Sequence, residues 1–309
     1  MFIVRNRNYF YAISGALVLA SIVLLATIGL RFGIDFTGGS LLEVEYTVGL
    51  PAVTDIYAIL EDIGIEGSSV RPTGESGFII RTPFLSQEDY STLKTALRSD
   101  TDWQYVEKRF DSIGPTIGTE LQSKSIWAII LVLVVITLFI AFAFRKVSKP
   151  VSSWKYGLVS LVALAHDVII PVGAFVLLGY FFGAEVDTLF VTALLVVLGF
   201  SIHDTIVVFD RVRENLKVNM EKNLKQPFDE IVGKSVMQTM ARSINTSLTT
   251  VLALIGLYFF GPEVIRYFVL ALIIGIIAGT YSSIFLGSPL LVTLEKLQKP
   301  EQEEKKKKK

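Results

Sequence analysis

The 309-residue chain is 51% hydrophobic and only 19% charged, with 29 basic and 29 acidic residues. A soluble globular protein carries about 25% charged residues, so this composition, with a mean hydropathy of +0.55, indicates a membrane protein. The lack of cysteine excludes disulfides, thiolate metal sites and cysteine nucleophiles, and two histidines leave little material for a zinc site.

Long apolar stretches dominate the chain. A membrane-spanning helix needs about 20 mostly apolar residues. Six segments meet this requirement and are predicted as spans: Phe10–Leu30, Ile126–Phe144, Leu158–Phe182, Val186–Phe209, Ile244–Phe260 and Tyr267–Leu294. The first is too long for a standard signal peptide.

The basic residues predict the orientation of these spans. Lys and Arg concentrate in segments 1–9, 145–157, 210–243 and 295–309, whereas connections 183–185 and 261–266 contain few. Because basic connections stay in the cytoplasm, both termini are predicted to be cytoplasmic and segment 31–125 external. The sequence thus predicts a multi-pass membrane protein.

Two parts of the predicted cytoplasmic surface leave alternatives open. Apolar residues recur at helical spacing within 227–242, which predicts either an amphipathic helix in the membrane interface or an N-terminal extension of span five. Lys305–Lys309 form a basic tail that is either solvated or held at anionic lipid or ribosomal RNA. No nucleic-acid partner is predicted.

Segment 31–125 has the pattern of a small α/β domain. Its predicted elements, in order, are strand Ser40–Thr47, helix Thr54–Ile63, strands Ser68–Pro72 and Gly77–Thr82, helix Ser86–Ser99 and strand Trp103–Phe110. The order βαββαβ predicts a ferredoxin-like fold. Thr54 is a candidate N-cap, Gly64 a candidate helix stop, and Ser86 with Asp89 a capping pair.

This domain contains no catalytic triad, glycine-rich phosphate loop or metal-ligand cluster. The sequence therefore predicts a binding or force-transmitting module that is not an enzyme and needs no cofactor or metal.

Two aspartates lie inside predicted spans, where ionisable groups are costly and mark functional sites. At 1.5 Å per residue, Asp167 lies about 15 Å inside span three and Asp204 about 10 Å inside span four, from the same side. Arg242 opens span five. An arginine near Asp204 stabilises the carboxylate while low-dielectric surroundings disfavour it, and a balance of the two suits reversible proton binding.

Asp204 shares a helix face with Ser201 and lies beside Thr205. On span five, Asn245, Thr246 and Thr249 continue the polar stripe of Arg242 at helical spacing. The competing interpretation is that these residues, with Asp167, only hold the helices in register. His166 and His203 are interpreted as buried or interfacial histidines rather than proton carriers.

Several motifs resemble the SecD/SecF family of protein-export membrane proteins, within the RND superfamily. They lie in order along the chain: Gly33–Ser40, Gly114–Gly118, Ala165–Asp167, Gly199–Asn215 and Arg242–Ser247. The long span-four motif resembles the SecF branch in particular. His203 and Phe200 depart from the family pattern, in which Asn and Tyr are common.

The resemblance implies a six-span RND-type bundle with one external ferredoxin-like domain, in a bacterial or archaeal cell membrane. It implies a separate SecD partner, assistance to the SecYEG translocon, and use of the proton-motive force to help move the translocating preprotein across the lipid bilayer. The family's proton-relay residues fall on Asp204 and Arg242, and Asp167 is a further candidate.

Asp35, Gly38 and Gly39 form a candidate hinge between span one and the external domain, because the glycines permit positive φ. Two other functions compete with protein export. One is an RND-type small-molecule efflux subunit, which a single external domain of about 80 residues disfavours. The other is a hydrolase with paired Asp167 and Asp204.

Overall fold

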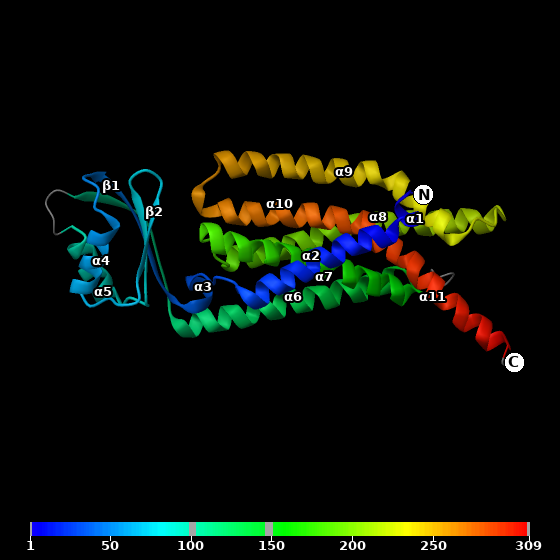
Figure 1. Cartoon of the computed structure of the whole chain (residues 1–309), viewed down its shortest axis with the longest axis horizontal. Helices are drawn as coiled ribbons and strands as arrows, with labels where there is room; N and C mark the ends of the chain where they lie inside the picture. Colours follow the sequence, from blue (N-terminus) through cyan, green and yellow to red (C-terminus); the bar gives the residue numbers. More distant parts are fainter. Residues whose placement is uncertain (1, 99–102, 146–150, 308–309) are drawn as a thin grey trace. The chain divides into compact units, whose positions relative to one another are not determined.

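The computed structural model describes residues 2–98, 103–145 and 151–307, with side chains in the last range described up to Leu297. It divides into two compact units (Figure 1). The α/β unit is Phe32–Ile126, and the helical unit combines Met1–Arg31 with Trp127–Lys309.

The α/β unit has the predicted element order. It begins with the short helix α3 (Ile34–Thr37) and continues with β1 (Gly39–Val48), α4 (Val53–Asp62), β2 (Ser69–Thr73), β3 (Gly77–Thr82), α5 (Gln87–Ala96) and β4 (Gln104–Ile113). The strands form one antiparallel sheet in the order β2-β3-β1-β4. The predicted ferredoxin-like fold is confirmed. Part of the predicted helix Ser86–Ser99 lies outside the described residues.

Period-two alternation explains how this sheet builds its core. Leu42 and Val44 on one face of β1 are buried with Ile56 and Leu60 of α4 and Leu93 of α5. Successive strand side chains point to opposite faces, so one face of β1 packs under the helices.

Local capping fixes both helices of the unit. The α4 N-terminus is capped at Ala52, whose N–H donates to Asp55 Oδ2 at 2.9 Å, so the predicted Thr54 cap is wrong. Gly64 ends α4 at φ +72°, as predicted. At α5, Asp89 N–H donates to Ser86 Oγ at 3.2 Å and Ser86 N–H donates to Asp89 Oδ2 at 3.1 Å. Ser86 Oγ also donates to Asp89 Oδ2 at 2.7 Å, and this bond, together with the one from Ser86 N–H, lowers the pKa of Asp89.

The helical unit contains all six predicted spans. Its helices are α1 (Phe2–Arg5), α2 (Arg7–Thr27), α6 (Pro115–Ala143), α7 (Ser153–Phe182), α8 (Thr188–Glu221), α9 (Phe228–Phe260), the 3₁₀ turn η1 (Glu263–Ile265), α10 (Arg266–Tyr281), the π-helix η2 (Ser282–Gly287) and α11 (Ser288–Lys307). The part of α6 before Trp127 belongs to the α/β unit. Among the described residues, six helices are long and apolar enough to cross a membrane, the last running through α10, η2 and into α11.

The spans form a central and a peripheral set. α7, α8 and α10 are the most buried, whereas α2, α6 and α9 leave most of their surface exposed. α10 packs against α7, α8 and α9, and α2 packs against α7. The candidate aspartates therefore lie on the two central helices α7 and α8.

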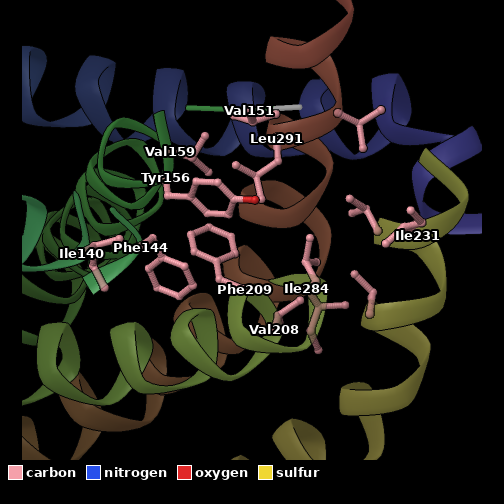
Figure 2. Close-up of a cluster of buried hydrophobic side chains, with 14 of the residues drawn as sticks. Ile140, Phe144, Val151, Tyr156, Val159, Val208, Phe209, Ile231, Ile284 and Leu291 are labelled. Carbon is pink, nitrogen blue, oxygen red and sulfur yellow. The ribbon is translucent and has the colours of Figure 1, made fainter. Parts of the chain in front are cut away.

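Buried apolar side chains from several helices form one apolar cluster in the helical unit (Figure 2). Phe144 and Tyr156 stack with ring centroids 5.2 Å apart, and Phe209 meets Tyr156 edge-on at 5.2 Å. Ile231 of α9 and Leu291 of α11 belong to the same cluster.

This cluster explains the path of segment 210–243. Phe228, Ile231, Val232 and Val236 are buried in it, so this part of the chain is continuous with span five as the start of α9, rather than a separate interfacial helix. α8 also continues past Phe209 to Glu221. The predicted loop is thus a helical hairpin with a short turn.

Candidate functional site

Asp167 lies at the centre of the helical unit with no exposed surface. Its Oδ2 accepts hydrogen bonds from Ser201 Oγ of α8 at 2.5 Å and Ser282 Oγ of η2 at 2.8 Å. His166 Nδ1 lies 2.9 Å from Oδ1. Three polar side chains therefore surround this carboxylate, which ties α7 to α8 and to η2.

Close helix packing brings these groups together. Gly275 and Gly279 on α10 form a GxxxG motif that lets neighbouring backbones approach closely. A Cβ at Gly275 would lie 2.3 Å from Val197, and one at Gly279 would lie 2.8 Å from Ser201 Cβ. The π-helix follows at once and places Ser282 against Asp167. Such π-helical turns occur often at functional sites.

Asp204 has a different environment on the face of α8 toward α9. Only 4% of it is exposed, and its Oδ2 is buried without a hydrogen bond. Ser243 and Ser247 of α9 lie beside the carboxyl group, and His203 and Arg242 are near enough to influence it electrostatically. Ser243 Oγ is also buried without a hydrogen bond. Two facing helices thus each present an unsatisfied polar atom.

The structure brings only some of the predicted relay residues together. Arg242 is exposed, and no ion pair joins it to Asp204 in the described chain. Ser201, predicted on the Asp204 face, bonds to Asp167, and Thr205 donates to Ser201 O at 3.2 Å. The remaining predicted residues, which lie on the exposed face of α9, are Asn245, Thr246 and Thr249.

The residues that sequence reasoning missed are small hydroxyl side chains: Ser243, Ser247 and Ser282. The available signal was their spacing. Ser243 and Ser247 are four residues apart and so share a helix face, which is not the face of Arg242. Within the described ranges, no group of three or more histidine, aspartate or glutamate side chains is placed to hold a metal.

The candidate hinge packs tightly within the α/β unit. Gly38 and Gly39 have φ of +72° and +126°. A Cβ at Gly38 would lie 2.8 Å from Pro115 Cα, and one at Gly118 would lie 2.8 Å from Gly38 N. Asp35 lies in the short helix α3 just before the glycines. The segment that enters the unit is therefore packed against the segment that leaves it.

Comparison with known proteins connects these features to a family. The family model described as Protein export membrane protein SecD/SecF, C-terminal, matches residues 92–297, and that of the SecD/SecF GG Motif matches residues 23–48. The chain is 42% identical over 305 residues to Protein translocase subunit SecF of Thermobaculum terrenum, covering 95% of this chain and 93% of that protein. The chain belongs to the SecD/SecF family. Protein translocase subunit SecF of Anaerolinea thermophila is 38% identical, and the match covers 95% of this chain and 94% of that protein.

Solved structures extend this family match to the fold. The crystal structure of SecDF from Thermus thermophilus, described as a translocon-associated membrane protein, matches with a TM-score of 0.81 and 32% identity. The match covers 96% of this chain and 39% of that one, so this chain spans well under half of the SecDF protein. The predicted six-span RND-type bundle with one ferredoxin-like domain is confirmed.

Proposed function

We propose that the chain is a non-enzymatic protein translocase subunit that binds and releases protons at Asp204 to assist late export of preproteins through SecYEG. The observation that carries this proposal is the buried, unsatisfied oxygen of Asp204. A buried polar atom without a partner is rare and calls for an explanation. Proton exchange explains the unsatisfied oxygen, because the protonated and the ionised carboxyl group need different hydrogen-bond partners.

The exposed face of α9 supports a SecD partner. Arg242, Asn245, Thr246 and Thr249 are exposed there, although α9 is otherwise apolar enough to span a membrane. Lipid offers no hydrogen bonds to such groups. We therefore propose that a SecD-type six-span partner covers this face and brings Arg242 to Asp204. This chain is 35% identical to the SecDF protein of Brucella abortus and covers 34% of it. The rest of that longer protein leaves room for a SecD-type part.

The proposed orientation puts the α8–α9 turn in the cytoplasm and the α/β unit outside, following the basic connections. A reporter inserted after Lys222 should read cytoplasmic, and one at Gly74 should read external. An external signal at Lys222 would overturn this orientation.

The test of function is Asp204→Asn in the complex with the SecD-type partner. Asn keeps the size of the side chain but cannot exchange a proton. We expect normal partner recovery, complete loss of gradient-stimulated export, and unchanged ATP-driven translocation. Asp210→Asn is the matched control, because Asp210 is an exposed acid on the same helix, paired with Arg213. Normal gradient stimulation in an assembled Asp204→Asn complex would refute the proposal.

Small-molecule efflux remains the second candidate, since it shares the superfamily. Co-purification separates the two. Recovery of a SecD-type chain and translocon subunits is expected, whereas recovery of a periplasmic adaptor and an outer-membrane channel would favour efflux.

A further inference from the structure

Four buried hydroxyl side chains form a row along α9. They are four residues apart and therefore lie on one helix face, in the order Ser235, Thr239, Ser243 and Ser247. Each step along the helix is about 6 Å, so the row spans about 18 Å. The predicted stripe of Arg242, Asn245 and Thr249 lies on a different face, which is exposed.

One end of the row reaches the protein surface. Asn215, which is half-buried near the C-terminal end of α8, donates from Nδ2 to Ser235 Oγ at 2.8 Å and to Gln238 Oε1 at 2.9 Å. Ser235 Oγ in turn donates to Ile231 O at 2.8 Å, and Thr239 Oγ1 donates to Ser235 O at 3.0 Å. The first hydroxyl is thus linked to a side chain that water can reach.

The other end of the row reaches Asp204. Ser243 and Ser247 both lie beside its carboxyl group, and Ser247 Oγ accepts a hydrogen bond from Thr280 Oγ1 of α10 at 2.6 Å. Ser243 Oγ has no exposed surface, and neither it nor Asp204 Oδ2 makes a hydrogen bond. Two buried polar atoms without partners, on facing helices, mark a position that suits an ordered water.

We propose that this row, which we name the hydroxyl row, is the path by which Asp204 exchanges protons with the compartment at the α8–α9 turn. A hydroxyl both donates and accepts hydrogen bonds. Each hydroxyl gives its proton to the next acceptor and receives one from the group behind it, with water molecules bridging the steps of about 6 Å. Asp204 gains or loses one proton, so its charge changes by one unit. Water at the α8–α9 turn gives or takes that proton, and each hydroxyl returns to its starting state.

This inference rests on the proposed function, since it needs Asp204 to exchange protons. The other titratable or charged groups acting on Asp204 are His203 of its own helix and Arg242 of α9. Asp167 is connected to α8 through Ser201 and lies outside the row. The path therefore runs between α8 and α9, with Thr280 of α10 in contact with its Ser247 end.

A competing explanation is that the small residues only let α8 and α9 pack closely. Variants that keep the shape but remove the hydroxyl separate the two explanations. Thr239→Val is nearly isosteric, and Thr239→Ser keeps the hydroxyl with less bulk. Ser243→Ala removes only one oxygen. Ser160→Ala is the matched control, because Ser160 is a buried serine on α7 that donates to Tyr156 O.

The experiment reconstitutes each variant, complexed with the SecD-type partner, in vesicles that contain the pH dye pyranine and records proton uptake under an imposed gradient. We expect Thr239→Val and Ser243→Ala to slow uptake by about a hundredfold, the lower end of what one positioned proton-transfer group contributes. Thr239→Ser and Ser160→Ala should conduct as the wild type does.

Partner recovery and thermal unfolding, measured on the same samples, identify any variant that fails to assemble. Wild-type uptake in both Thr239→Val and Ser243→Ala, alongside loss of uptake in Asp204→Asn, would overturn the hydroxyl row but keep the proposed function. Wild-type uptake in Asp204→Asn itself would overturn the proposed function.

Discussion

The two buried aspartates of the helical unit occupy contrasting environments. Asp167 has polar partners on both carboxylate oxygens, contributed by α7, α8 and η2, whereas Asp204 leaves one buried oxygen unsatisfied. A fully bonded buried carboxylate loses several interactions when its charge changes, so it suits a structural role. A buried carboxyl group that has one unsatisfied oxygen and lies beside hydroxyl side chains suits proton exchange.

The contrast also shows why burial alone does not identify a relay. Both side chains are almost completely buried in membrane helices, and sequence analysis places both among the relay candidates. Their hydrogen-bond partners distinguish them. We propose that Asp167 holds the central helices in register and that Asp204 carries the proton.

The largest stability effect is expected for Asp167→Ala. This change leaves Ser201 and His166 without their carboxylate partner, whereas Ser282 Oγ keeps Gly279 O as an acceptor. Each buried polar group left unsatisfied costs about 1–3 kcal/mol. We expect a much lower unfolding temperature in detergent and poor partner recovery. Asp210→Ala, at an exposed ion pair, should change either by little. Wild-type melting with lost proton uptake would reverse the roles assigned to the two aspartates.

A smaller effect is expected where α10 meets α8. Gly275→Ala would place a methyl group 2.3 Å from Val197, and overpacking of this kind costs about 1–3 kcal/mol. Thermal unfolding should show this loss, while the folded fraction keeps proton uptake because α9 and the hydroxyl row are unchanged. Gly256→Ala is the control, since nothing lies within 4 Å of its Cβ position. Equal melting of the two variants would contradict this packing.

The smallest effect is expected for an exposed carboxylate, Asp89, in the α/β unit. Ser86 lowers its pKa in the folded state through side-chain and backbone hydrogen bonds. The group therefore stabilises the fold above its unfolded pKa and loses this contribution as pH falls through the folded pKa. Asp89→Asn should speed amide hydrogen exchange in α5 slightly at neutral pH, and the difference from wild type should vanish in acid.

Glu88→Gln provides the comparison for Asp89, because it removes a charge from the same helical turn and leaves the capping pair intact. A difference between Asp89→Asn and wild type that persists unchanged below the folded pKa would show that the charge of Asp89 is not its source.

The sequence was sufficient for most of the fold because the relevant signals are local. Apolar runs of span length and period-two alternation predict the spans and the βαββαβ order. The ends of α8 and α9 were not predictable in the same way. Segment 210–243 is polar on average, yet it is helical on both sides of the turn between Glu221 and Phe228, where residues such as Phe228 pack into the apolar cluster.

The candidate site was predictable only in part. Asp167 and Asp204 stand out because a charge inside an apolar span is rare. Ser243 does not stand out, since serine is common and its role depends on which face of α9 packs against α8. Arg242 and Asn245 attract attention as polar residues, but the structure leaves both exposed. The register of one helix against its neighbour is a tertiary property, and spacing along a single helix does not determine it.

The central claim is that Asp204, and not Asp167, changes its protonation state. Infrared difference spectroscopy of the complex with the SecD-type partner, recorded between two pH values, detects the carbonyl stretch of a protonated carboxyl group. We predict that the band accompanying proton uptake disappears in Asp204→Asn and persists in Asp167→Asn. A band that survives in Asp204→Asn and disappears in Asp167→Asn would contradict the account.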